Sequence, residues 1–442
     1  MGSYIPSTQK EREEMLNAIG LDNINQLYDG IPSQVLLHRE LNIPSGKSEM
    51  EVRAEMSAMA AKNTVFPHIF RGAGAYNHYI PSIVKYVSAK EEFVTAYTPY
   101  QAEISQGVLQ SIFEYQTEMC ELTGMDVSNA SVYDGATAAA EAVGMCRERK
   151  RQVALVSATT NPDVIEVIKT YCHGANATVE IVPEKDGVTD MEALKSMLCE
   201  TSACFYVQQP NYYGIFEDCE ALGEIAHAGG AKYIMGCNPI ALGIMKSPGE
   251  CGADVATAEG QPLGMSLAFG GPYLGIMACT TAMMRKMPGR IVGETVDADG
   301  QRCYVLTLQA REQHIRREKA SSNICSNQAL CALTATVYLA AMGPDGLKNV
   351  ASQCISKAHY AAKEIISVKG FELKYGGEFF NEFVTTCPIC PDKLMSELEK
   401  KGILGGLPFE KDGEKLILWC VTEMNSKADI DMLVNTIKEV AE

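Results

Sequence analysis

Long apolar runs, an excess of positive charge and closely spaced cysteines are all missing from this sequence of 442 residues. No apolar run approaches the roughly 20 residues that a membrane-spanning helix needs. Residues 1–25 are polar and charged, without the apolar segment of a signal peptide. We therefore expect a cytoplasmic protein with no membrane partner.

Basic residues are outnumbered, since 38 Lys and Arg stand against 55 Asp and Glu, which gives a formal net charge of −17. Proteins that bind nucleic acid do so with clustered Lys and Arg. The charge balance therefore argues against nucleic acid and leaves small molecules or other proteins as partners.

Metal and nucleotide motifs are also missing. The seven histidines show no ligand spacing such as H-x-x-x-H, and no Walker A sequence occurs. Residues 71–77, RGAGAYN, lack the third glycine of a dinucleotide fingerprint and follow no strand. The sixteen cysteines are scattered, and we interpret the single CxxC, Cys387 to Cys390, as ordinary reduced thiols without a zinc or redox role. We expect no metal site.

What is present is an alternation of short apolar runs with helical stretches between residues 153 and 237. This rhythm is typical of βαβ units around a mostly parallel, buried sheet. We expect a helical N-terminal arm over residues 1–75, a large α/β domain over 76–325, and a small C-terminal α+β domain over 326–442.

The pattern changes in the C-terminal part. Helical runs are expected at 329–342, 347–368, 391–400 and 427–440, and strands at 371–375, 383–387 and 416–421. Strands flanked by helices at this spacing indicate an α+β domain.

Two segments combine polar side chains with a helix start. Residues 131–137, SVYDGAT, place a glycine turn before a small-residue helix, which indicates either a tight helix entry or backbone N–H groups offered to an anion. Residues 311–326 concentrate charge, which is usual for a solvated face, but Ser321, Ser322 and Asn323 can also cap a helix whose amides face a phosphate.

Two tyrosines, Tyr97 and Tyr100, lie on either side of a proline turn in an irregular segment. A tyrosine hydroxyl can donate or accept a hydrogen bond at a site, and packing at an interface explains the pair equally well.

A lysine is missing where one fold class would place it. Residues 252–278 are expected to form a strand, a polar turn and a second strand. In pyridoxal-phosphate enzymes of the aspartate-aminotransferase type, this turn carries the lysine that binds the cofactor as a Schiff base. Here no lysine lies between Lys246 and Lys286.

Four stretches together resemble a known family: 72–119, which includes GAGAYNHYIP and TAYTPYQAEISQ, 130–142, 259–275 and 311–330. They are similar to the first, α-type subunit of the glycine decarboxylase P-protein of the glycine cleavage system, in its two-polypeptide form. The similarity extends over essentially the whole chain, and it implies a large domain of the fold-type-I pyridoxal-phosphate transferase class.

The resemblance implies decarboxylation of glycine and transfer of the aminomethyl group to the lipoyl arm of the H-protein. Pyridoxal phosphate, which serves as electron sink for the carbanion, would be bound covalently by the β-type partner subunit. Asn238 would replace the aspartate that faces the pyridine nitrogen. This chain would have no catalytic residue of its own, but would lend the partner's active site Tyr97, Tyr100 and His78, with Ser321, Ser322 and Asn323 near the cofactor phosphate.

Two alternatives stay open. The chain could be a catalytically silent scaffold or regulatory relative with the same fold. It could also be an autonomous enzyme that uses Lys232 or Lys246, but Lys232 precedes its strand and Lys246 lies in a turn flanked by proline.

Overall fold

The computed structural model describes residues 6–96, 98–324 and 327–442, and it forms two compact units, Met1–Val65 and Phe66–Glu442. The first unit contains the helices α1 (Gln9–Ala18) and α2 (Glu49–Ala60). Both begin with a capping box, in which the side chains of Thr8 and Ser48 accept backbone N–H groups. None of the residues described in this unit is buried.

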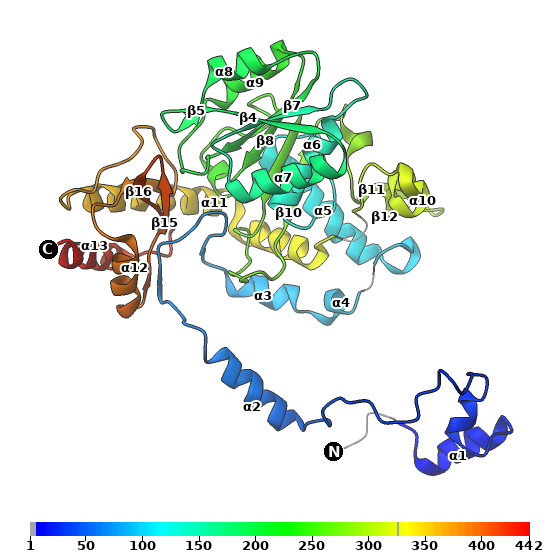
Figure 1. The fold of residues 1–442 in the computed structure, drawn as a ribbon. Coiled ribbons are helices and arrows are strands. Elements are labelled where there is room, and N and C mark those ends of the chain that lie inside the picture. Colours follow the sequence, from blue (N-terminus) through cyan, green and yellow to red (C-terminus); the bar gives the residue numbers. More distant parts are fainter. Residues whose placement is uncertain (1–5, 97, 325–326) are drawn as a thin grey trace. The chain divides into compact units, whose positions relative to one another are not determined.

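The larger unit is built on a seven-stranded sheet with the order β2-β10-β9-β8-β7-β3-β4 (Figure 1). The strands β9, β8, β7, β3 and β4 are parallel, and β10 and β2 are antiparallel to their neighbours. Their bounds are β2 Val127–Ser128, β3 Val153–Ser157, β4 Thr178–Val182, β7 Ser202–Gln209, β8 Lys232–Cys237, β9 Val255–Glu259 and β10 Gly275–Cys279. The mostly parallel sheet expected from the sequence is confirmed.

Helices cover both faces of the sheet. Successive residues of a strand point to opposite sides of the sheet, so each strand contributes side chains to two cores. On β3, Ala154 and Val156 pack into one core with α6 (Gly135–Cys146) and α7 (Pro162–Gly174). Leu155 packs into the other core with α8 (Met191–Met197) and α9 (Cys219–Ala228). Burial on both faces explains why these strands read as continuous apolar runs.

Further helices and strands complete the part of the larger unit before α11 (Ala329–Ile366). They are β1 His68–Ile69, α3 Ser82–Ser88, α4 Glu91–Val94, α5 Gln106–Thr123, β5 Glu184–Lys185, β6 Val188–Thr189, β11 Ile291–Val296, β12 Arg302–Thr307 and α10 Gln313–Arg316.

The C-terminal part contains a three-stranded antiparallel sheet with the order β13-β16-β15. Its elements are β13 Glu382–Thr386, α12 Pro391–Lys400, β14 Ile403–Leu404, β15 Leu407–Lys411, β16 Glu414–Cys420 and α13 Lys427–Ala441. The only tryptophan of the chain, Trp419, is fully buried in this core. Strand β1 pairs with β14, so residues 66–75 belong to the larger unit, whereas the sequence assigned them to the arm. The expected boundary at residue 325 stays a prediction.

One strand expectation was wrong, because residues 371–375 form only a bridge between Leu373 and Thr385. Strand β15 was not expected. Strand β15 contains Pro408 and none of its residues is fully buried, so it lacks the apolar run that marked the other strands.

Helix α11 (Ala329–Ile366) joins the two helical runs expected from the sequence, with non-helical backbone at Gly343 followed by Pro344. By length and composition it could cross a membrane, a test that the core helix of a soluble protein also passes. Its residues Ala335 and Ala358 are fully buried in two different cores of this unit.

Candidate functional site

A cavity of about 350 Å³ opens at the carboxyl ends of β7, β8 and β9. Pro210, Asn238 and Glu259, which end or follow these strands, line it together with residues 72–76 and the first residues of α6. In open α/β sheets ligands bind at this edge, so the cavity lies where the fold would place a cofactor.

The start of α6 forms one wall of the cavity. The backbone N–H of Thr137 donates to Asp134 Oδ1 (2.7 Å), and that of Gly135 donates to Glu259 Oε2 (2.9 Å). The sequence left two readings of this turn open. The structure supports the tight helix entry, because carboxylates of the chain itself accept these amide groups.

Glu259 is held by more than the helix. Its Oε1 accepts the backbone N–H groups of Gln261 (2.9 Å) and Leu274 (3.1 Å). Burial raises the pKa of Glu259 to about 7, although these hydrogen bonds favour the ionised form. Glu259 was not expected at the site, because in the sequence it reads as the polar end of a strand.

A second buried carboxylate fixes the glycine-rich loop at residues 72–76. The backbone N–H of Ala73 donates to Glu382 Oε1 (2.6 Å), and Tyr76 Oη donates to Glu382 Oε2 (2.8 Å). Tyr76 also exchanges two backbone bonds with the side chain of Gln261. The loop that resembles half of a dinucleotide fingerprint therefore binds the chain's own side chains.

The lysines weighed in the sequence lie elsewhere. Lys232 Nζ donates to Asp254 (2.7 Å), and Lys246 pairs with Glu220 at the surface. Neither lines the cavity. Asn238 does line it, and its Oδ1 accepts the backbone N–H of Ile240 (2.9 Å).

Pyridoxal phosphate does not fit the chemistry of this lining. Among the described residues around the cavity, four are acids (Asp134, Asp163, Glu259 and Glu382) and none is Lys, Arg or His. Covalent binding of the cofactor requires a lysine amine, which this lining lacks. The backbone N–H groups at the start of α6 that could hold its phosphate already donate to carboxylates of the chain.

Only one of the two tyrosines predicted at a partner's site can be placed, because Tyr97 lies outside the described residues. Tyr100 is 46% exposed, and Arg290 donates to its hydroxyl (2.8 Å) while lying over its ring at 4.9 Å. A neighbouring cavity of about 640 Å³ is lined by Tyr100, Phe93 and Ile104. This segment offers a concave, partly apolar surface.

Ser321, Ser322 and Asn323 line another cavity, of about 340 Å³, and cap no helix. Ser322 Oγ donates to Glu141 Oε1 on α6 (2.9 Å), and burial raises the pKa of Glu141 to about 7. Helix α11 begins only at Ala329, after Gln328, whose side chain makes no capping bond. The expected cap was therefore wrong, and the phosphate contact stays a prediction.

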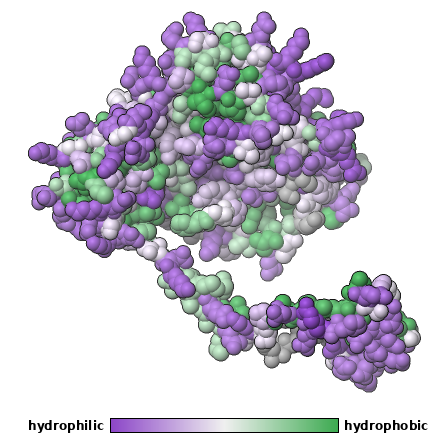
Figure 2. Space-filling model, in the orientation of Figure 1, coloured by the Kyte–Doolittle hydropathy of each residue, from purple (hydrophilic) through white to green (hydrophobic). Residues whose placement is uncertain are grey.

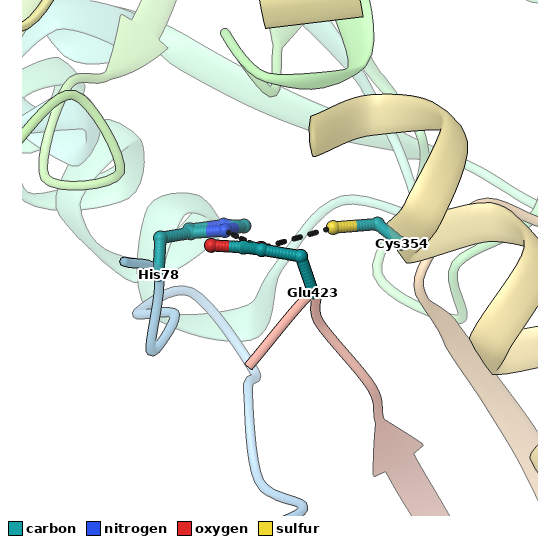
Figure 3. A group of neighbouring side chains, drawn as sticks. All are labelled: His78, Cys354 and Glu423. Atoms are coloured by element: carbon teal, nitrogen blue, oxygen red, sulfur yellow. Dashed lines mark hydrogen bonds and ion pairs between the residues drawn. The ribbon is translucent and has the colours of Figure 1, made fainter. Parts of the chain in front are cut away.

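His78 is turned into the chain, with 2% of its side chain exposed. Figure 3 shows His78 and Cys354 both directed at the carboxylate of Glu423, at 2.7 Å and 3.4 Å. The three ligand atoms lie within 4.8 Å of one another, as a metal site would require. A metal between them would have to replace the direct His78–Glu423 contact, which already ties the loop at residue 78 to the segment after β16. A role of His78 in a partner's site stays a prediction.

The CxxC pair consists of free thiols. Cys387 is buried, and its Sγ donates to the carbonyl of Ile389 (3.4 Å), whereas Cys390 is exposed at the start of α12.

The match to protein families decides the identity. The model of the family described as glycine cleavage system P-protein matches residues 2–437. The chain belongs to the glycine cleavage system P-protein family. The resemblance seen in the sequence is thereby confirmed.

Individual relatives agree. The chain is 50% identical over 436 residues to the probable glycine dehydrogenase (decarboxylating) subunit 1 of Desulforamulus reducens, which covers 97% of this chain and 98% of that protein. A crystal structure of glycine decarboxylase (P-protein) of the glycine cleavage system, in inhibitor-bound form, superposes with a TM-score of 0.93 at 39% identity, over 99% of this chain and 100% of that chain.

A glutamate decarboxylase from Lactobacillus brevis shares the fold alone, with a TM-score of 0.68 at 11% identity, over 94% of this chain and 97% of that chain. The fold is that of the fold-type-I pyridoxal-phosphate enzymes. The chain is a subunit of the decarboxylating glycine dehydrogenase, and pyridoxal phosphate is the cofactor that this fold supports.

The buried Glu382 predicts a pH dependence of stability. Burial raises its pKa from 4.5 in the unfolded chain to about 7 in the folded one. Between these values the folded state keeps a proton that the unfolded state releases, so stability is lost as the pH rises. For one group this amounts to about 3 kcal/mol, at 1.36 kcal/mol per unit. We expect Glu382→Gln to lose less free energy of unfolding than the parent from pH 5 to pH 8, by about this amount.

The measurement is urea unfolding followed by the fluorescence of Trp419, which neighbours the partner of Glu382 on β16. The exposed Glu200 provides the control, since Glu200→Gln should follow the parent at both pH values. Parallel curves for Glu382→Gln and the parent would show that the buried carboxyl does not titrate in this range.

Proposed function

We propose that this chain completes the active site of a lysine-bearing β-type partner and has no cofactor lysine of its own. The partner binds pyridoxal phosphate covalently, decarboxylates glycine and passes the aminomethyl group to the lipoyl arm of an H-protein. The observation that carries the proposal is the acidic cavity, without lysine, at the cofactor edge of a cofactor-enzyme fold. The name subunit 1 among the relatives supports a second subunit. A cytoplasmic location stays a prediction.

The N-terminal unit supports an assembly with another chain. Its helices α1 and α2 have no buried residue. On α2 even the apolar side chains are each at least 45% exposed, namely those of Met50, Val52, Met56 and Met59. A segment without a core cannot offset the entropy lost when it is ordered. We infer that the partner subunit covers this apolar surface.

A second apolar surface lies on the larger unit, on α3 and α4 and the segments before and after them. Its large exposed side chains are Tyr79, Ile83, Tyr86, Val94, Tyr100 and Ile104. Figure 2 shows apolar side chains gathered among polar ones where these helices lie. Exposed apolar patches mark interaction sites. We propose this surface, with Tyr97 and Tyr100, as the part that faces the partner's active site.

The first test is assembly. Because obligate interfaces bury on the order of 2,000 to 5,000 Å², co-expression with the β-type chain should give one complex of fixed stoichiometry by light scattering. Removal of residues 1–65 should weaken that complex. Two chains that migrate independently at micromolar concentration would refute the heteromer.

The second test separates a contributing subunit from a scaffold. We expect Tyr97→Phe and Tyr100→Phe in the reconstituted complex to lower bicarbonate exchange into glycine roughly ten- to a hundredfold, the effect of one charge-assisted hydrogen bond. Tyr360 on α11 is the control: its hydroxyl donates to Asp431 on α13 (2.6 Å), away from this surface, and Tyr360→Phe should leave the rate unchanged.

Ser322→Ala distinguishes the two roles of that serine. A contact with the partner's cofactor phosphate predicts weaker cofactor retention, whereas a bond to Glu141 alone predicts lower stability at the parental rate. If all three variants exchange at the parental rate in an intact complex, the chain is a scaffold.

A further inference from the structure

The cavity at the edge of the sheet has the framework of a phosphate site. Helix α6 has 12 residues and begins at Gly135. Its first two residues, Gly135 and Ala136, line the cavity, so the backbone N–H groups of the helix start lie at its wall. Such amides, with the helix dipole behind them, are suited to a phosphate group. In this chain they are directed at carboxylates.

Glu259 reaches these amides from the end of β9. Its two oxygens accept three backbone N–H groups, from Gly135 on α6, from Gln261, and from Leu274 just before β10. A carboxylate with several backbone donors imitates the way in which a phosphate is bound.

The backbone of Glu259 packs directly against the start of α6. A Cβ added to Gly135 would lie 2.8 Å from both the backbone nitrogen and the Cβ of Glu259. The helix start and the strand end are therefore in direct contact, and the side chain of Glu259 enters the space in front of α6.

The charge of the lining also disfavours a phosphate group. A phosphate monoester carries about −1.5 to −2 charges at pH 7. Among the described lining residues it would meet the acids Asp134, Asp163, Glu259 and Glu382 and no basic side chain.

We propose that Glu259 takes the place of a cofactor phosphate, and that it thereby bars pyridoxal phosphate from the cavity of this chain. Given the proposed function, it is a specificity-determining residue that confines cofactor loading to the partner. The loss of the lysine alone would not have this effect, because a phosphate site without a lysine can still hold the cofactor without a covalent bond.

The test uses the isolated full chain and needs no partner. Titration calorimetry with pyridoxal 5′-phosphate and with inorganic phosphate should give no saturable binding to the parent. Glu259→Ala frees three amides and removes one charge, so both ligands should bind at least about tenfold more tightly than to the parent. Pyridoxal, which has no phosphate, should gain nothing.

Asp163→Asn is the matched control, because it removes one acid from the same lining but frees no amide of α6. Glu259→Ser is the second variant should Glu259→Ala fail to fold, and the fluorescence of Trp419 reports folding. Three results would each overturn the proposal: saturable binding to the parent in competition with phosphate, an equal gain in Asp163→Asn, or no gain in a folded variant of Glu259. None of them bears on whether the heteromer forms.

Discussion

The carboxylate of Glu259, held between α6 and the two strands β9 and β10, is the interaction on which the candidate site depends. It accepts backbone N–H groups from three segments. One of these segments contains Gln261, whose side chain accepts the backbone N–H of Tyr76 in the glycine-rich loop. Glu382 then connects that loop to β13 in the C-terminal sheet. These links join buried side chains to backbone and, at Tyr76, to a second side chain, so a continuous network of the chain's own groups frames the cavity.

This network shows how a cofactor-enzyme fold can be kept around a cavity whose described lining contains no lysine. The apolar cores on both sides of the sheet depend on the strands and helices, which need no lysine. Internal carboxylates can therefore occupy the ligand edge without any change in these apolar cores. The surfaces that face outward, on the arm and after α3, keep the apolar character that an assembly needs.

Much of the fold could be predicted from the sequence, because buried parallel strands such as β3 and β8 are continuous apolar runs and α6 begins at a clear Asp-Gly entry. The missing lysine was also evident. The rest depended on contacts between distant segments: Ser322 with Glu141, His78 with Glu423, and Ala73 with Glu382 are separated by 181, 345 and 309 residues. No local pattern marks such pairs. The nearest available signal for Glu259 was an acid at the end of a strand, in the turn where a lysine was sought.

The most direct measurement is borohydride reduction of the complex with the β-type chain after loading with pyridoxal phosphate, followed by peptide mapping of both chains. The account predicts one reduced cofactor per pair of chains, on a lysine of the partner, and none on this chain. A stoichiometric label on a lysine of this chain, such as Lys232 or Lys246, would contradict it.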